Sequence, residues 1–339
     1  MNIAFQEAAT AAPADAAPGR VCPLRYRYGP GAIASAETRS AHTLYVVGGL
    51  YGNLPALDTI ELMARMETQA GAPPPTLCFN GDFNWFNVAD RDFAEINLRV
   101  LANDAILGNV EAELDAPSDD AGCGCAYPAS VDAAVVARSN QIHARLKGTA
   151  RRHAELLGRI ARLPMLARYR VAECRIGVVH GDAESLAGWG FDVDALDEPS
   201  HVAWVRAMFD AAEVDLFAST HTCLPALRRF TRTAGGDACV VNNGAAGMPN
   251  FRSELAGLCT RIATTPSPHS ALQEIRVAGA WVALLPVRFD AGRWQSDFLS
   301  QWPPGSPAWE SYFQRISRGP AFEPKRARLP TRGMPASAP

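Results

Sequence analysis

The chain has 339 residues, of which 48% are hydrophobic and 20% are charged, and this composition excludes a fibrous or intrinsically disordered protein. Its 32 Lys and Arg against 35 Asp and Glu give a net charge of -3, which offers no general attraction to nucleic acid or to membrane surfaces. Eight cysteines are too few for a disulfide-stapled scaffold, and no run approaches the roughly 20 apolar residues of a membrane span, so we expect a cytoplasmic protein with mostly reduced thiols.

The ends of the chain differ in composition from its middle. Residues 1–20 are rich in Ala and Pro and show no period that would bury one face, so we predict a disordered tail there and another over 319–339. Between them, over 21–318, we predict a single domain. Short β-rich apolar runs alternate there with longer helical patterns, which is typical of an α/β protein. The runs lie at 43–47, 76–79, 104–107, 175–179, 214–218 and 238–242, with a closing strand at 281–289 and a last amphipathic helix at 308–318.

Each of the first six runs ends in a cluster of small and polar residues. In open α/β sheets, ligands bind beyond the carboxyl ends of the strands. We therefore expect these six loops to converge on one site.

Residues 131–170 carry apolar side chains at helical spacing and predict one or two helices inserted between the third and fourth runs. Nine Arg or Lys and one acid lie between residues 138 and 170. One interpretation is a solvated basic helix face. The other is a wall beside the site that attracts phosphate, formed by Arg138, Arg145, Arg151 and Arg152.

The six loops contain, in chain order, GLYGN at 49–53, GD at 81–82, GNVE at 108–111, HG at 180–181, THTCLP at 220–225 and NGAAGMP at 243–249. Together they resemble the motif series of the calcineurin-like metallophosphoesterases, especially their small bacterial phosphodiesterase-like branch. That series is D-x-H-G-N, G-D, G-N-H-E, a lone H-G, G-H-x-H-x-P and an N-x-G segment. Any one motif is a weak match, but six in the right order make a specific resemblance.

This resemblance implies a four-layer α/β/β/α sandwich, here with the helical insertion over 131–170. It also implies two neighbouring metal sites that activate water against a phosphoester. One of these sites is complete, because its ligand positions are occupied as in the family by Asp82, Asn109, His180 and His221. A carboxylate, an amide oxygen and two imidazoles suit Mn, Fe or Zn.

The other metal site departs from the family pattern. Gly49 and Tyr51 stand where the family has Asp and His, and Cys223 replaces its second His. Val110 replaces the histidine that protonates the leaving group, a role worth about 10²–10⁴-fold in rate. We therefore expect one divalent metal per chain and hydrolysis of a phosphorylated small molecule or phosphodiester with a good leaving group, with no protein partner implied.

Several groups near the expected site allow more than one interpretation. Cys123 and Cys125, together with Cys223, are either ligands of a soft metal, a redox pair or incidental thiols. Tyr51 is either a phenolate ligand or a ring packed over the sheet end, and the carboxyl group of Glu111 is a further candidate. Two other functions therefore stay open: a non-catalytic, metal-containing binding module, and a thiol- or metal-dependent modifying enzyme that uses the three cysteines.

Overall fold

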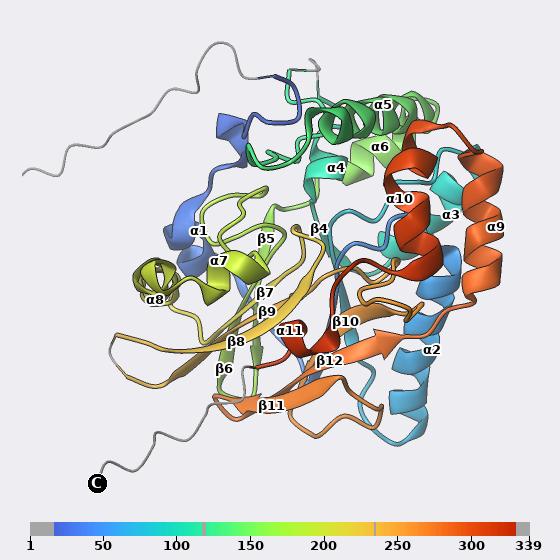
Figure 1. Cartoon of the computed structure of the whole chain (residues 1–339). Helices are drawn as coiled ribbons and strands as arrows, with labels where there is room; N and C mark the ends of the chain where they lie inside the picture. The colour runs from blue at the N-terminus through green and yellow to red at the C-terminus, as the bar shows by residue number, and fades with distance from the viewer. Residues whose placement is uncertain (1–16, 117–119, 234, 330–339) are drawn as a thin grey trace, which may run out of the picture.

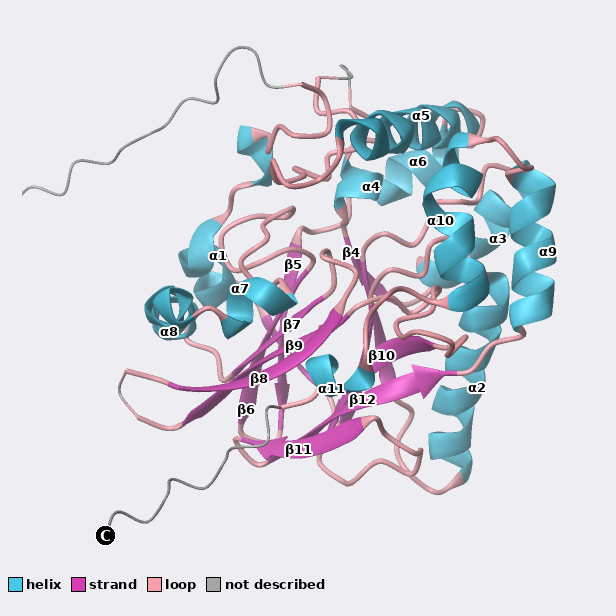
Figure 2. Cartoon of the chain, viewed as in Figure 1, coloured by secondary structure: helices cyan, strands magenta, loops and turns pink. Residues whose placement is uncertain are grey.

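The computed structural model describes residues 17–116, 120–233 and 235–329. Two six-stranded sheets face each other and helices cover their outer sides (Figures 1 and 2). The four-layer α/β/β/α sandwich expected from the sequence is therefore confirmed. Within the described ranges, no helix combines the length and the apolar character needed to cross a membrane.

Each sheet contains three consecutive parallel strands. The six runs identified in the sequence become β2, β3, β4, β6, β7 and β9, and these strands pair in parallel within their sheets. The first sheet has the order β1 (Thr38–Ser40), β5 (Leu166–Val171), β6 (Cys174–Val179), β7 (Leu216–Ser219), β9 (Asp237–Asn243) and β8 (Pro225–Thr231). The second has the order β11 (Gln273–Val277), β12 (Ala280–Val287), β10 (Gly257–Ala263), β2 (Thr43–Val47), β3 (Thr76–Asn80) and β4 (Asp104–Ile106).

Helices form the two outer layers and close one end of the sandwich (Figure 1). The first sheet is covered by α1 (Gly29–Ser35), α7 (Val193–Asp197) and α8 (Val202–Ala212), and the second by α2 (Leu54–Gln69), α3 (Asp90–Val100) and α9 (Ala291–Gln301). The others are α4 (Asn109–Ala112), α5 (Ala133–Ala150), α6 (Ala154–Ile160), α10 (Pro307–Arg318), α11 (Pro324–Ala327) and the short 3-10 helices η1 (Leu24–Tyr26) and η2 (Pro199–His201).

The apolar character of the central strands follows from burial on both faces. In β2, Leu44 and Val46 join the core between the two sheets, whereas Tyr45 and Val47 pack toward the outer helices. Because successive side chains of a strand point to opposite faces, a strand covered on both sides is a continuous apolar run. Such strands lie in the middle of the sandwich, and their ends are therefore held in fixed positions.

The inserted segment is partly helical and partly strand. Of the one or two helices expected here, the structure has two, α5 and α6, but the prediction that helix extends to residue 170 is wrong, because β5 begins at Leu166. Pro164 precedes this strand and opposes continuation of a helix. Ala167, Tyr169 and Val171 then alternate into the core between the sheets, a period of two that is typical of a strand.

Both predicted tail boundaries also need correction. Phe322 and Ala327 are buried in the core between the first sheet and its helices, so residues 319–329 belong to the packed domain. At the other end, Gly19 N donates a hydrogen bond to Ala121 O (2.9 Å), and the guanidinium of Arg20 donates to two carbonyl oxygens. These contacts were invisible in the sequence because the partners lie more than 70 residues away. The remainder of the predicted tails, 1–16 and 330–339, lies outside the described residues.

Candidate metal centre

The six loops meet at one edge of the sandwich, as the sequence predicts. Gly49 N donates to Gly81 O (3.2 Å) and Ala246 N donates to Gly48 O (2.9 Å), which joins the loops of the second sheet to the last loop of the first. Thr220 N donates to His180 O (3.1 Å). The carboxyl ends of parallel strands lie along one edge, so these backbone contacts bring side chains from distant parts of the sequence together.

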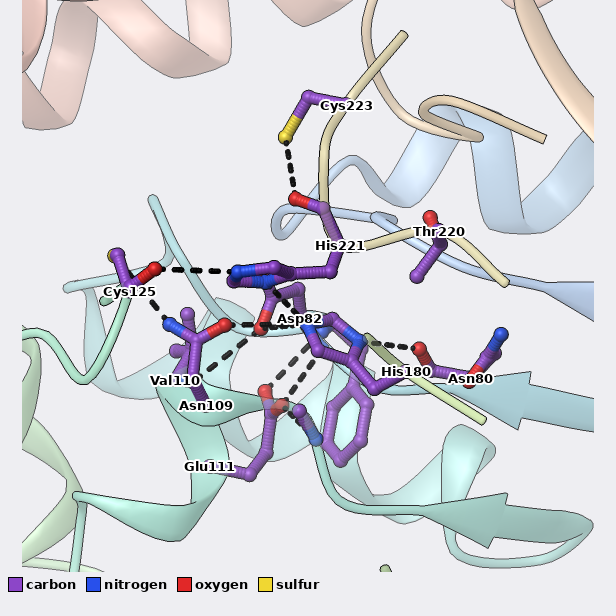
Figure 3. A network of polar contacts seen from close by, with 12 residues as sticks. Asn80, Asp82, Asn109, Val110, Glu111, Cys125, His180, Thr220, His221 and Cys223 are labelled. Carbon is purple, nitrogen blue, oxygen red and sulfur yellow. Dashed lines mark hydrogen bonds and ion pairs between the residues drawn. The ribbon is translucent and has the colours of Figure 1, made fainter. Parts of the chain in front are cut away.

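Four buried side chains face one another where these loops meet (Figure 3). The ligand atoms of Asp82, His180 and His221 all lie within 4.8 Å of one another. His180 Nε2 is 3.4 Å from Asp82 Oδ1 and 3.2 Å from His221 Nδ1. It also lies 3.1 Å from Asn109 Oδ1. The structure therefore brings the four residues of the predicted metal site together, and we call them the acceptor cluster.

Backbone carbonyls fix which atoms of the acceptor cluster face inward. His180 Nδ1 lies 2.8 Å from Asn80 O, and His221 Nε2 lies 3.2 Å from Cys125 O. A carbonyl oxygen only accepts hydrogen bonds, so these two ring nitrogens carry the protons. Asn109 Nδ2 likewise donates to Cys123 O (2.9 Å), which turns its Oδ1 toward His180. The inward-facing nitrogens and oxygens thus present lone pairs to a common space.

Electrostatics in the acceptor cluster favour a positive charge beside Asp82. Burial lowers the pKa of His180, but the Asp82 carboxylate and its hydrogen bond outweigh burial, so that this pKa lies above its usual value. Burial and the neighbouring His180 lower the pKa of His221 to about 3. Burial raises the pKa of Asp82, but His180 and its hydrogen bond outweigh burial and leave this pKa below its usual value. Asp82 is therefore an anion and His221 a neutral imidazole, and the positive charge that His180 supplies to Asp82 is one that a bound cation would supply in its place.

The residues at the other family metal positions make a different structure, which we call the filled half. Tyr51 Oη and Cys223 Sγ lie 2.8 Å apart and form a hydrogen bond. Cys223 Sγ also donates to His221 O (3.3 Å). A Cβ atom added to Gly49 would lie 2.9–3.2 Å from the Tyr51 ring, so this ring occupies the space beside the glycine. These contacts fit the interpretation of Tyr51 as a ring packed over the sheet end.

The cysteines near the acceptor cluster do not add ligand atoms to it. Across the described part of the chain, the one group of three His, Cys, Asp or Glu side chains whose ligand atoms lie close enough for a metal is Asp82, His180 and His221. Cys123 and Cys125 instead contribute their carbonyl oxygens to Asn109 and His221. The Cys125 thiol lies 3.4 Å from Asn109 Nδ2, on the side that faces away from the cluster.

Glu111 lies beside the acceptor cluster and stabilises the loop that carries Asp82 through hydrogen bonds to its backbone. Its carboxylate accepts hydrogen bonds from the backbone N–H groups of Asp82 (2.7 Å), Phe83 (3.1 Å) and Asn84 (3.2 Å). Asp82 has a positive φ of 53°, and the Glu111 contacts hold this left-handed turn in place. Burial and then the Asp82 carboxylate raise the pKa of Glu111 to about 7. Its carboxyl group points at the backbone and not into the open space above the cluster (Figure 3).

A cavity of about 60 Å³ opens above the acceptor cluster, and aromatic rings form much of its wall. Apart from Tyr51, the sequence did not identify these rings. Trp189 lies between two glycines in the loop after His180, which was a local signal, whereas Tyr312 on α10 had no signal in the sequence near any motif. The lining residues are Tyr51, Asp82, Trp85, Asn109, Val110, Cys125, Tyr127, Trp189, His221, Cys223 and Tyr312.

The four arginines of the inserted segment do not line this cavity, which contradicts the predicted phosphate-attracting wall. Arg138 donates to Ser311 Oγ (2.7 Å), and the Arg145 guanidinium stacks 4.5 Å above the Trp302 ring. Arg152 binds the Asp90 carboxylate (2.9 Å), and Arg151 is exposed. Arg138, Arg145 and Arg152 thus contact neighbouring side chains outside the cavity and Arg151 is exposed, so the basic helix face is the better interpretation.

Comparisons with known proteins bear on the fold. No protein-family model and no curated protein matches the chain. Among solved structures, a hypothetical protein from Pyrococcus horikoshii OT3 is similar, with 15% identity, a TM-score of 0.56, and coverage of 84% of this chain and 100% of that one. A metallophosphoesterase from Sphaerobacter thermophilus has 16% identity, a TM-score of 0.47 and coverage of 82% and 100%.

A likeness at 15% identity establishes a shared fold and leaves the chemistry to be argued from the site. The chain, with its two six-stranded sheets, therefore shares its overall fold with the Pyrococcus horikoshii protein.

Proposed function

We propose that this protein is a metal-dependent phosphoesterase-like hydrolase that acts through one divalent cation. Asp82, Asn109, His180 and His221 would hold the ion, and the mixed oxygen and nitrogen ligands suit Mn, Fe or Zn. The observation that carries the proposal is the convergence of four ligand atoms, three of them on side chains that backbone carbonyls orient. A divalent cation bound there supplies a nucleophile at neutral pH, because it lowers the pKa of bound water from 15.7 toward about 7.

The residues around the acceptor cluster support ligand binding by orienting it. A histidine ligand ordinarily donates its second N–H to a carbonyl or carboxylate, which fixes its tautomer and ring orientation. Asn80 O plays this part for His180 and Cys125 O plays it for His221. Burial of all four proposed ligands keeps bulk water from competing for their lone pairs.

Two features narrow the substrate. Val110 occupies the position of the family's proton donor, and the nearby Glu111 carboxylate is occupied by backbone N–H groups. The leaving group must therefore depart without a proton from either residue, which favours esters of acidic alcohols or phenols. A phosphorylated small molecule or phosphodiester of this kind agrees with the fold and with the motif series.

An activated aryl phosphodiester tests the proposal directly. The purified protein is loaded separately with Mn²⁺, Fe²⁺ and Zn²⁺, and turnover and bound metal are measured for the wild type and for His180→Ala. We expect one metal per chain and slow turnover in the wild type, and loss of both in the variant. His42→Ala, at the opposite end of β2, is the matched control and should keep both. Turnover that survives His180→Ala would refute the role of the metal.

A non-catalytic binding module is the second candidate function. The filled half favours it, because Tyr51 and Cys223 leave a single cation site. This function predicts a folded protein that binds one metal but hydrolyses no phosphoester with any of the three ions. The same measurements therefore separate the two functions.

A further inference from the structure

Aromatic side chains surround the opening of the cavity above the acceptor cluster. Trp85 is buried at 3% exposure, whereas Tyr127, Trp189 and Tyr312 are half-buried and reach the surface. Trp189 stands edge-to-face against His221, with 5.4 Å between ring centroids, and Tyr127 lies 6.3 Å from Trp189. Trp85 and Tyr312 form another edge contact at 6.3 Å. The rings thus form a nearly continuous wall that begins at a proposed metal ligand.

The loop that carries Trp189 is held firmly. The Asp182 carboxylate accepts hydrogen bonds from the N–H groups of Glu184 (2.9 Å), Ser185 (3.0 Å) and Gly190 (3.0 Å). Trp189 Nε1 donates to Cys125 O (3.2 Å), the carbonyl that also orients His221. A fixed ring presents a ready surface to a ligand, since little side-chain entropy is lost on binding.

The same wall offers no positive charge. Among the described residues that line the cavity, none is Lys or Arg. Arg315 lies behind the filled half, but its guanidinium donates to Pro249 O (3.1 Å) and Cys223 O (2.7 Å). A ligand therefore meets the proposed cation at the bottom of the cavity and aromatic rings above it.

The lining of the cavity gives the two parts of a phosphoester different surroundings. A phosphoryl group bound at the acceptor cluster lies at the base of the cavity, whose wall includes Tyr127, Trp189 and Tyr312. The ester group attached to it therefore lies beside these rings.

We propose that Trp189, with Tyr127 and Tyr312, forms a subsite for a flat aromatic ester group and makes this site selective for aryl over small alkyl phosphoesters. The inference rests on the proposed function, because it assumes that a phosphoryl group binds at the acceptor cluster. Trp189 is the specificity-determining residue of the subsite, and its ring supplies the contact.

Two phosphonates with non-hydrolysable C–P bonds test the subsite without turnover. Phenylphosphonate and methylphosphonate have the same anionic head and differ in the ring, and their binding to the Mn²⁺-loaded protein is measured by calorimetry. Stacking between rings stabilises a complex enough to predict roughly tenfold tighter binding of phenylphosphonate. Trp189→Ala should abolish this preference.

Two further variants separate the ring from its hydrogen bond and from general effects on the loop. Trp189→Phe keeps an aromatic ring but loses the N–H that binds Cys125 O, and it should retain most of the preference. Trp204→Phe changes a half-buried tryptophan that stacks on His201 and does not line the cavity, so the preference should be unchanged. Metal affinity is measured for each variant, so that damage to the acceptor cluster is recognised.

The outcomes decide the subsite independently of catalysis. Equal affinity for the two phosphonates in the wild type, a preference that persists in Trp189→Ala, or no binding of phenylphosphonate would each overturn it. A ring preference that depends on Trp189 without hydrolysis of any phosphoester would support the subsite and contradict the proposed function. Metal-dependent hydrolysis with no preference for aryl esters would support the proposed function and contradict the subsite.

Discussion

The acceptor cluster and the filled half are built by the same loops but satisfy their polar atoms in opposite ways. In the acceptor cluster, backbone carbonyls accept hydrogen bonds from one N–H group each of His180, His221 and Asn109. The other ring nitrogens and the Asn109 oxygen then face one another. In the filled half, the Tyr51 hydroxyl and the Cys223 thiol satisfy each other. The acceptor cluster could therefore hold a cation, whereas the side chains of the filled half satisfy each other. The loop geometry permits both arrangements, and the side chains decide between them.

Asp82→Asn should have the largest effect on this contrast. Asparagine keeps the size of the side chain and tolerates the left-handed φ at this position, but it removes the negative charge of the acceptor cluster. We expect Mn²⁺ affinity to fall about 100-fold or more, or roughly 3 kcal/mol. Calorimetric titration measures the change, with the exposed Asp115→Asn as control. Unchanged affinity would show that the cluster is not the metal site.

Converting the filled half into a second cation site is the next test. The triple variant Gly49→Asp, Tyr51→His and Cys223→His restores the family ligands: the smaller imidazole at residue 51 relieves the contact with a Cβ at residue 49, and aspartate is one of the few non-glycine residues that adopts the φ of 65° there. We expect the bound metal to rise from one to two ions per chain, as measured by elemental analysis. Tyr51→His alone should still bind one ion. A folded triple variant with one metal would mean that backbone geometry, and not side-chain identity, separates the two halves.

Glu111→Gln tests whether the hydrogen bonds to the loop after Asn80 require a charged carboxylate at residue 111. The glutamine amide cannot accept several backbone N–H bonds with both of its terminal atoms. Hydrogen bonds to charged groups contribute about 1.5–3 kcal/mol, so we expect the free energy of unfolding to fall by about 2 kcal/mol in urea titrations. The exposed Glu155→Gln should change it by less than about 0.5 kcal/mol. If Glu111→Gln lowered the free energy of unfolding as little as the control does, the proposed contribution of these hydrogen bonds to stability would be contradicted.

The smallest effect is expected from Tyr51→Phe in the filled half. This change removes one hydrogen bond to Cys223 and keeps the ring in place. The free energy of unfolding should fall by about 1 kcal/mol while one metal still binds per chain. Thermal unfolding and elemental analysis of the same samples check both parts. Loss of the metal would instead identify the Tyr51 oxygen as a ligand.

Features of the fold that depend on short stretches of sequence were predictable, and features that depend on residues far apart in the chain were not. The six strands and the loops that follow them were predictable, because apolar runs that end in Gly, Asn and Asp are local patterns. Strand β5 was missed although Ala167, Tyr169 and Val171 alternate, since the helical pattern before it masked a short period of two. The packed segment after residue 319 had no such signal, because Phe322 is buried by partners far away in the chain, such as Phe251.

The sequence by itself determined the order of the strands, the loops at their ends and the residue types of the acceptor cluster, because these depend on short-range patterning. Only the tertiary structure decided which atoms of Asn109 and His221 face inward, since the carbonyls of Cys123 and Cys125 fix them. It also decided that Trp189 and Tyr312 stand over the cluster and that the arginines of α5 do not. Such choices depend on packing between elements that are far apart in the sequence, as Tyr51 and Tyr312 are, and the entropic cost of closing the chain is offset only in the complete fold.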